Sequence, residues 1–203
     1  MFDRQMRQVK DVAFGPLARP LRRFSPTSLT LAALFCGVGT AVALYYQLYL
    51  VAFLGWFLNR AFDALDGVVA RQQGRQTDFG GYLDIVVDFV VYALIPVGLV
   101  WGRPSPTGFL LLAILLAAFY VNAASWMYLA AILEKRALGA AAQSEQTTIT
   151  MPEGVVGGTE TIVFYGLFIL FPGWYEELFG LMAALVGLTI LQRILWAYRH
   201  IRS

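Results

Sequence analysis

Cysteine, histidine and charged residues are all scarce in this chain. Cys36 is the one cysteine and His200 the one histidine, and only 14% of the 203 residues are charged. A single cysteine excludes an intrachain disulfide, and one cysteine with one histidine cannot form a Cys/His metal site within one chain. Oxygen atoms are the ligands that remain for a metal. The charged fraction also lies well below the roughly 25% of an ordinary soluble domain.

Apolar residues dominate the chain and predict an integral membrane protein. They make up 59% of the sequence, whose length is enough for about six spans of roughly 20 residues each. We expect an all-α bundle of six transmembrane helices that forms one domain, residues 25–203. The expected spans are residues 28–46, 49–70, 82–101, 107–133, 155–171 and 175–198.

The lysines and arginines predict the orientation of these spans. They precede the first span, lie between the second and third, and follow the fourth and sixth, whereas the opposite side offers only Arg103. Because positive residues are retained on the cytoplasmic side, both termini and the end of the second span are expected in the cytoplasm. The expected location is a prokaryotic plasma membrane.

Residues 1–24 mix apolar with basic side chains and predict a juxtamembrane amphipathic helix on the membrane surface. A disordered basic tail is the alternative for the first ten of them. No cleaved signal peptide is expected, because the first long apolar stretch begins only after Pro26.

Four aspartates lie at membrane depth in or near the expected second and third spans. Asp63 and Asp66 are i,i+3 neighbours and Asp84 and Asp88 are i,i+4 neighbours, so each pair projects from one face of its helix. Clustered carboxylates beside lipid cost several kcal/mol of desolvation, roughly, unless cations or protons neutralise them. Two divalent ions would balance the four charges, and carboxylate oxygens favour hard ions such as Mg²⁺ or Mn²⁺.

The residues that follow Asp66 indicate a phosphate-bearing ligand. Gly67 and Ala70 remove side-chain bulk, so a ligand or another helix can approach the backbone closely. Arg71 adds a planar cation that suits two-point contact with phosphate oxygens. The alternatives are helix packing for the two small residues and a topology anchor for Arg71.

These residues share one spaced pattern, D-x-x-D-G-x-x-A-R, eight residues, then G-x-x-x-D-x-x-x-D. With it the chain resembles the CDP-alcohol phosphotransferase (CDP-alcohol phosphatidyltransferase) family. The fixed positions are filled by Asp63, Asp66, Gly67, Ala70, Arg71, Gly80, Asp84 and Asp88. The resemblance implies transfer of a phosphatidyl-type group from a CDP-linked lipid, such as CDP-diacylglycerol, to the hydroxyl of a small alcohol, with release of CMP. It also implies a homodimer in the lipid membrane and no nucleic-acid partner.

The resemblance also implies a role for each matched residue. Asp63, Asp66 and Asp84 would be ligands of two divalent ions, Mg²⁺ or Mn²⁺. Asp88 would be the general base and would also contact the second metal. The nucleotide and diphosphate pocket would be lined by Gly67, Ala70, Arg71, Thr77 and Gly80.

The residues after Asp88 bear on the acceptor. Phe89 follows it, where an enzyme acting on a phosphorylated acceptor is expected to carry a lysine or arginine, and the run 88–96 resembles the serine or choline branches of the family. A serine- or choline-like acceptor is therefore favoured. Glycerol phosphate or inositol phosphate is the alternative acceptor. From another functional class, a cation or proton transporter could use the aspartates as a relay.

Overall fold

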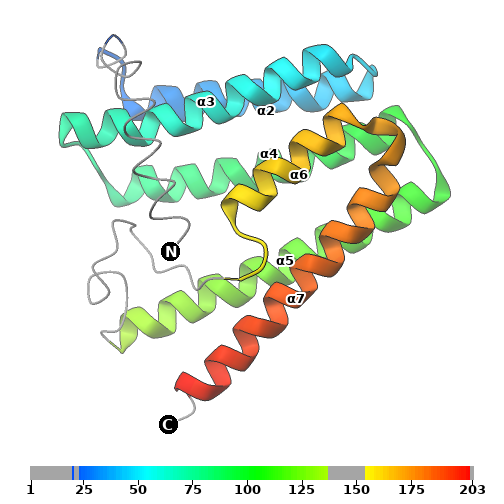
Figure 1. Cartoon of the computed structure of the whole chain (residues 1–203). Helices are drawn as coiled ribbons and strands as arrows, with labels where there is room; N and C mark the ends of the chain where they lie inside the picture. The colour runs from blue at the N-terminus through cyan, green and yellow to red at the C-terminus, as the bar shows by residue number, and fades with distance from the viewer. Residues whose placement is uncertain (1–19, 21–22, 137–153, 202–203) are drawn as a thin grey trace. The chain divides into compact units, whose positions relative to one another are not determined.

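Every regular element in the described part of the chain is helical (Figure 1). The computed structural model describes residue 20 and residues 23–136 and 154–201. Its elements are α2 (Pro26–Tyr45), α3 (Tyr49–Gln73), α4 (Asp78–Gly102), α5 (Pro106–Lys135), α6 (Gly158–Leu170), the short 3₁₀ helix η1 (Pro172–Trp174) and α7 (Tyr175–Ile201). The all-α expectation is confirmed for these residues. The largest boundary difference is at the start of α4, expected at residue 82 and found at Asp78.

Four segments of the described residues are long and apolar enough to cross a membrane, namely α2, α4, α5 and residues 172–201. This agrees with a multi-pass membrane protein. Helix α3 is long enough but carries Arg60, Asp63 and Asp66 among its apolar residues. Helix α6 has 13 residues and so extends only about 20 Å, less than a hydrocarbon core of about 30 Å. The count of six spans therefore stays a prediction, and the amphipathic segment 1–24 lies almost wholly outside the described residues.

Local signals in the sequence set the ends of α2, α3 and α4. The Ser25 hydroxyl accepts a hydrogen bond from the Ser28 backbone N–H (3.1 Å), and Pro26 begins α2. Gly74 ends α3 in the left-handed conformation, with φ of 62°. Thr77 then caps α4 by accepting from the Gly80 N–H (3.1 Å). The short turn between α3 and α4 therefore follows from residues that stop one helix and start the next.

The chain divides into two compact units, and the aspartates lie in the first, Met1–Ser105 with Tyr165–Pro172. In this unit α2 packs against both α3 and α4. Gly98 of α4 lies so close to the Ala41 carbonyl of α2 that a Cβ would collide with it, and Gly102 lies in the same way against Leu44. The absent side chains allow the two backbones to approach closely, which fixes α4 on α2.

The second unit contains the α5–α7 pair, and a buried arginine joins these two helices. Arg193 is 6% exposed, and its guanidinium donates to the Asn122 side-chain oxygen (2.7 Å) and the Ser125 hydroxyl (2.8 Å). Arg136 at the end of α5 donates to the Ile201 carbonyl at the end of α7 (3.0 Å). Asn122 and Ser125 therefore have a structural role in the contact between α5 and α7.

Cysteine labelling tests the predicted orientation. Helix α5 has 30 residues and so extends about 45 Å, enough to place residues 103 and 136, which flank it, on opposite sides of a bilayer. In a Cys36→Ser background, Arg103→Cys should react with a membrane-impermeant thiol reagent from outside the cell. Arg136→Cys should react only after the membrane is permeabilised. Labelling of both positions from the same side would refute the topology.

Candidate functional site

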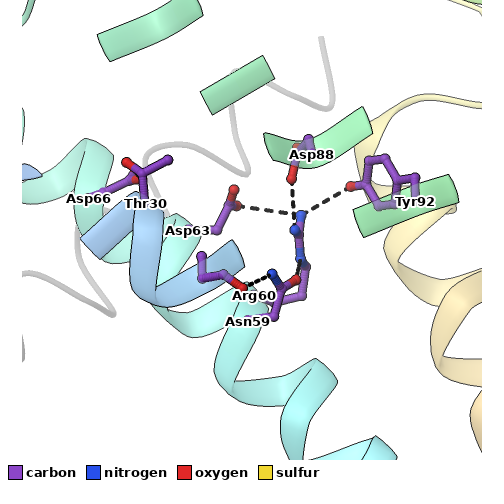
Figure 2. Close-up of polar contacts among 8 residues, drawn as sticks. Thr30, Asn59, Arg60, Asp63, Asp66, Asp88 and Tyr92 are labelled. Atoms are coloured by element: carbon purple, nitrogen blue, oxygen red, sulfur yellow. Dashed lines mark hydrogen bonds and ion pairs between the residues drawn. The ribbon is translucent and has the colours of Figure 1, made fainter. Parts of the chain in front are cut away.

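The polar centre of the first unit is Arg60 on α3, which reaches across to α4 (Figure 2). Its guanidinium donates to the Asp88 carboxylate (Nη2 to Oδ1, 2.7 Å) and to the Tyr92 hydroxyl (Nη1 to Oη, 3.0 Å). Asp63, one turn along α3, forms a longer ion pair with the same group (Nη1 to Oδ2, 3.6 Å). One largely buried cation therefore pairs with two of the four motif aspartates.

Aromatic rings and an asparagine hold the Arg60 side chain in place. Its guanidinium carbon lies 4.8 Å from the centre of the Trp56 ring and 5.3 Å from that of Tyr92. Its Nε donates to the Asn59 side-chain oxygen (2.7 Å). Asn59 is itself fully buried and donates to the Ala33 carbonyl on α2 (2.7 Å). Hydrogen bonds thus hold the edges of the guanidinium, and the two aromatic rings lie near its carbon.

Asp66 has a separate partner on α2. It is 7% exposed, and its Oδ2 accepts a hydrogen bond from the Thr30 hydroxyl (2.6 Å), whose oxygen also lies 3.2 Å from the Pro26 carbonyl oxygen. Figure 2 shows Asp66 beside Thr30, while Asp63 points toward Arg60. A hydroxyl donor offsets part of the cost of burying this carboxylate.

Asp84 completes the acidic group. It is half-buried on α4 and interacts electrostatically with Asp63, Asp66, Asp88 and Arg60. The four aspartates therefore lie within electrostatic reach of one another. The spacing within each helix predicted only the face that each pair shares, and their roles as ligands and base stay predictions. The residues between the two pairs, including the turn at Gly74, return the chain so that Arg60 on α3 reaches Asp88 on α4.

The fit of this neighbourhood to a metal depends on donor chemistry. Four carboxylates form an oxygen donor set that suits Mg²⁺ or Mn²⁺. Among the described residues, however, no three histidine, cysteine or acidic side chains converge closely enough to hold an ion as they stand. Two of the carboxylates have protein partners instead, Asp88 with Arg60 and Asp66 with Thr30. The ligand types fit the metal.

The predicted nucleotide residues lie at the C-terminal end of α3 and the start of α4. A Cβ on Gly67 would lie 3.2 Å from an Arg71 guanidinium nitrogen, so the glycine leaves room for that exposed side chain. Ala70 is half-buried on the same helix. The Gly80 N–H donates a hydrogen bond to the Thr77 hydroxyl at the start of α4. Their contribution to a nucleotide pocket stays a prediction.

Sequence reasoning missed Arg60 and Thr30. Arg60 was detectable in part, since it stands three residues before Asp63 and so on the same helix face. Its partners Asp88 and Tyr92 are 28 and 32 residues away along the chain, and no local signal connects them to it. Thr30 is 36 residues from Asp66, and only the packing of α2 on α3 brings them together.

Comparison with known proteins gives a family match over most of the chain. The sequence profile of the CDP-alcohol phosphatidyltransferase family matches residues 23–191. Inner membrane protein YnjF of Escherichia coli K12 is 34% identical over 179 residues, which cover 88% of this chain and 85% of that protein. The archaetidylinositol phosphate synthase of Methanothermobacter thermautotrophicus is 28% identical over 69% of this chain and 66% of its own length.

Solved structures share the fold. The phosphatidylinositol phosphate synthase PgsA1 of Mycobacterium tuberculosis, in a crystal structure with CDP-DAG bound, has a TM-score of 0.69 at 22% identity and covers 90% of this chain and 92% of that one. The same enzyme in complex with manganese and citrate has a TM-score of 0.68 at 22% identity, and the match covers 88% of this chain and 86% of that one.

Proposed function

This chain belongs to the CDP-alcohol phosphatidyltransferase family, and we propose that it transfers a phosphatidyl-type group from a CDP-linked lipid to an alcohol hydroxyl and releases CMP. The observation that carries the proposal is the placement of the motif aspartates, with Asp63 and Asp88 both paired to Arg60 and Asp66 hydrogen-bonded to Thr30 in the same unit. Asp84 lies within electrostatic reach of the other three. Family membership makes the protein an enzyme, so the transporter alternative is not needed. A homodimer remains part of the prediction.

The acceptor proposed is a phosphorylated polyol of the inositol phosphate class. The serine- or choline-like acceptor that the residues after Asp88 favoured has no support among the relatives. The relatives whose names state an acceptor include synthases of archaetidylinositol phosphate and phosphatidylinositol phosphate. The correction has a physical reason, because one position such as Phe89 reports a single side chain, whereas an acceptor pocket is built from several helices.

The residues of the site divide the work of phosphoryl transfer. Enzymes of this family use Mg²⁺ or Mn²⁺, and Asp63, Asp66 and Asp84 would hold the ions, which stabilise charge on the transferring group. Asp88 would accept the proton of the acceptor hydroxyl as that oxygen attacks phosphorus. Arg71 would bind the phosphate oxygens of the donor by two-point contact.

Replacement of Arg71 by lysine tests this last role. Arg71→Lys keeps the positive charge but cannot supply two parallel N–H donors, so the KM for the CDP-lipid should rise by about tenfold or more. Steady-state kinetics of CMP release measures it. Arg75→Lys, an exposed arginine just beyond the end of α3, is the matched control and should behave as wild type. An unchanged KM in Arg71→Lys would leave Arg71 as a topology anchor only.

A panel of alcohols tests the proposed acceptor. The purified full chain in detergent would receive CDP-diacylglycerol and Mg²⁺ or Mn²⁺ with inositol phosphate, glycerol phosphate, serine or choline. Mass spectrometry of the lipid products would then identify what was transferred. We expect a product with inositol phosphate, and a product with serine or choline alone would restore the acceptor that the sequence favoured.

A further inference from the structure

We propose that Arg60 is a positioning residue that orients the Asp88 carboxylate for its reaction with the acceptor hydroxyl. The inference rests on the proposed role of Asp88 as general base. Arg60 is not among the eight fixed positions of the family pattern, so the inference comes from this chain's own contacts. The guanidinium lies 2.7 Å from the Asp88 carboxylate, which is closer than its 3.6 Å distance to the Asp63 carboxylate.

The guanidinium can orient the Asp88 carboxylate because several neighbours fix the orientation of the guanidinium itself. Nε donates to Asn59 at 2.7 Å, Nη1 to the Tyr92 hydroxyl at 3.0 Å, and Nη2 to Asp88 at 2.7 Å. The side chain is 12% exposed, so water competes little for these donors. A planar group held at three nitrogens has a fixed plane, and the carboxylate oxygen that it binds is fixed with it.

The neighbours of Arg60 are themselves anchored to other helices. Asn59 donates to the Ala33 carbonyl of α2 (2.7 Å). The carbonyl of Tyr92 accepts a hydrogen bond from the Tyr165 hydroxyl in α6 (2.5 Å). The rings of Trp56 and Tyr165 stack at 5.6 Å between centroids. Contacts with α2 and α6 therefore fix the residues that hold Arg60, and Arg60 in turn fixes the Asp88 carboxylate on α4.

Orientation of a base matters because proton transfer needs hydrogen-bond reach and alignment. A displacement of about 1 Å at a reacting group can cost on the order of 10²-fold in rate. Asp88 is the more exposed partner, with 29% of its side chain accessible against 12% for Arg60. The hydrogen bond from the guanidinium fixes one oxygen of this carboxylate, so loss of that bond relaxes the orientation of the base. The loss should therefore fall on kcat rather than on donor binding.

A double-mutant cycle between Arg60→Gln and Asp88→Asn tests whether Arg60 acts through Asp88. In the purified full chain, Arg60→Gln should lower kcat by about 10- to 100-fold while KM for CDP-diacylglycerol stays within about threefold. Arg60→Lys should lose about tenfold, because a point charge restores attraction without the fixed plane. In the Asp88→Asn background, Arg60→Gln should cost less than about threefold more.

A milder variant and a binding measurement guard against a simple folding defect. Tyr92→Phe keeps the ring and removes only the hydroxyl that meets Arg60, so it should lower kcat by about threefold, and that loss should vanish beside Asp88→Asn. Mn²⁺ affinity of Arg60→Gln, measured by electron paramagnetic resonance, should not weaken, because a guanidinium supplies no ligand and repels a dication. Arg103→Gln, an exposed arginine at the other end of α4, is the matched control.

Specific results would overturn the inference. If the losses of Arg60→Gln and Asp88→Asn multiply in the double variant, Arg60 acts independently of Asp88. Weakened Mn²⁺ binding, or a wild-type or raised kcat, in Arg60→Gln would also exclude the positioning role. Failure of the proposed function is distinct, since the wild-type chain would then release no CMP. Failure of the base assignment is distinct as well, since Asp88→Asn alone would then keep wild-type turnover or lose donor binding.

Discussion

Asparagine in place of Asp63, Asp66 or Asp84 is expected to abolish turnover and to weaken Mn²⁺ binding by at least about 100-fold. Loss of an outer-shell partner alone costs ~10- to 100-fold in metal affinity, and a direct ligand should cost no less. Removing one carboxylate leaves two dications under-compensated and displaces the phosphates that they bind. CMP release measures the turnover, and electron paramagnetic resonance of free Mn²⁺ measures the affinity.

Asp78→Asn is the matched control for these three variants. Asp78 is an exposed aspartate in the first turn of the same helix as Asp84, outside the motif. It should retain wild-type turnover and metal affinity. Transfer by the wild-type protein in the presence of a chelator would contradict a metal-dependent mechanism, whatever the variants do.

Asp88→Asn should separate catalysis from donor binding. An alcohol hydroxyl is a poor nucleophile at neutral pH, so loss of the carboxylate that takes its proton should slow transfer by roughly 10²-fold or more. Asparagine has the same shape and can still occupy the place beside Arg60, so binding of the CDP-lipid should fall only modestly. Single-turnover transfer and equilibrium binding of CDP-diacylglycerol measure the two effects separately.

The opposite pattern has a clear meaning. If donor binding by Asp88→Asn collapses together with turnover, Asp88 serves chiefly as a metal ligand and its assignment as the base is wrong. Measured Mn²⁺ affinity then places it with Asp63, Asp66 and Asp84. A variant with unchanged turnover would exclude both roles.

Much of the helical layout could be predicted because its signals are local. Apolar runs placed the six described α-helices, and Ser25, Gly74 and Thr77 are residue types that cap helices in the way the structure uses them. The pairing of the aspartates within each helix was predictable for a similar reason, since i,i+3 and i,i+4 spacing fixes which helix face a side chain occupies. That the two pairs lie near each other was implied only by the family pattern.

The network around Arg60 could not be predicted from sequence because it depends on tertiary contacts. An arginine in an apolar helix is compatible with a topology anchor, an ion pair within α3 or a contact with another helix. The packing of α2 against both α3 and α4 selects the contact with another helix, and Asp88 and Tyr92 then lie at the guanidinium. The Thr30 partner of Asp66 follows from the same packing.

The number of spans remained open for a physical reason. Hydropathy treats each charge in α3 as a cost, yet three of those charges belong to the site, where Arg60 pairs with Asp63 and Asp66 accepts a hydrogen bond. Compensated charges are less costly at membrane depth than isolated ones. Composition alone therefore overstates the cost of placing the charges of α3 at membrane depth.

Release of CMP from CDP-diacylglycerol tests the central claim most directly. The purified chain would be incubated with CDP-diacylglycerol, inositol phosphate and Mn²⁺, and CMP and the lipid product would be quantified together. We predict equal amounts of CMP and an inositol-phosphate lipid, no release of either after chelation of the metal, and none from a variant with asparagine at Asp63, Asp66 and Asp84. Absence of CMP with every acceptor and either metal, or equal CMP release by that variant, would contradict the account.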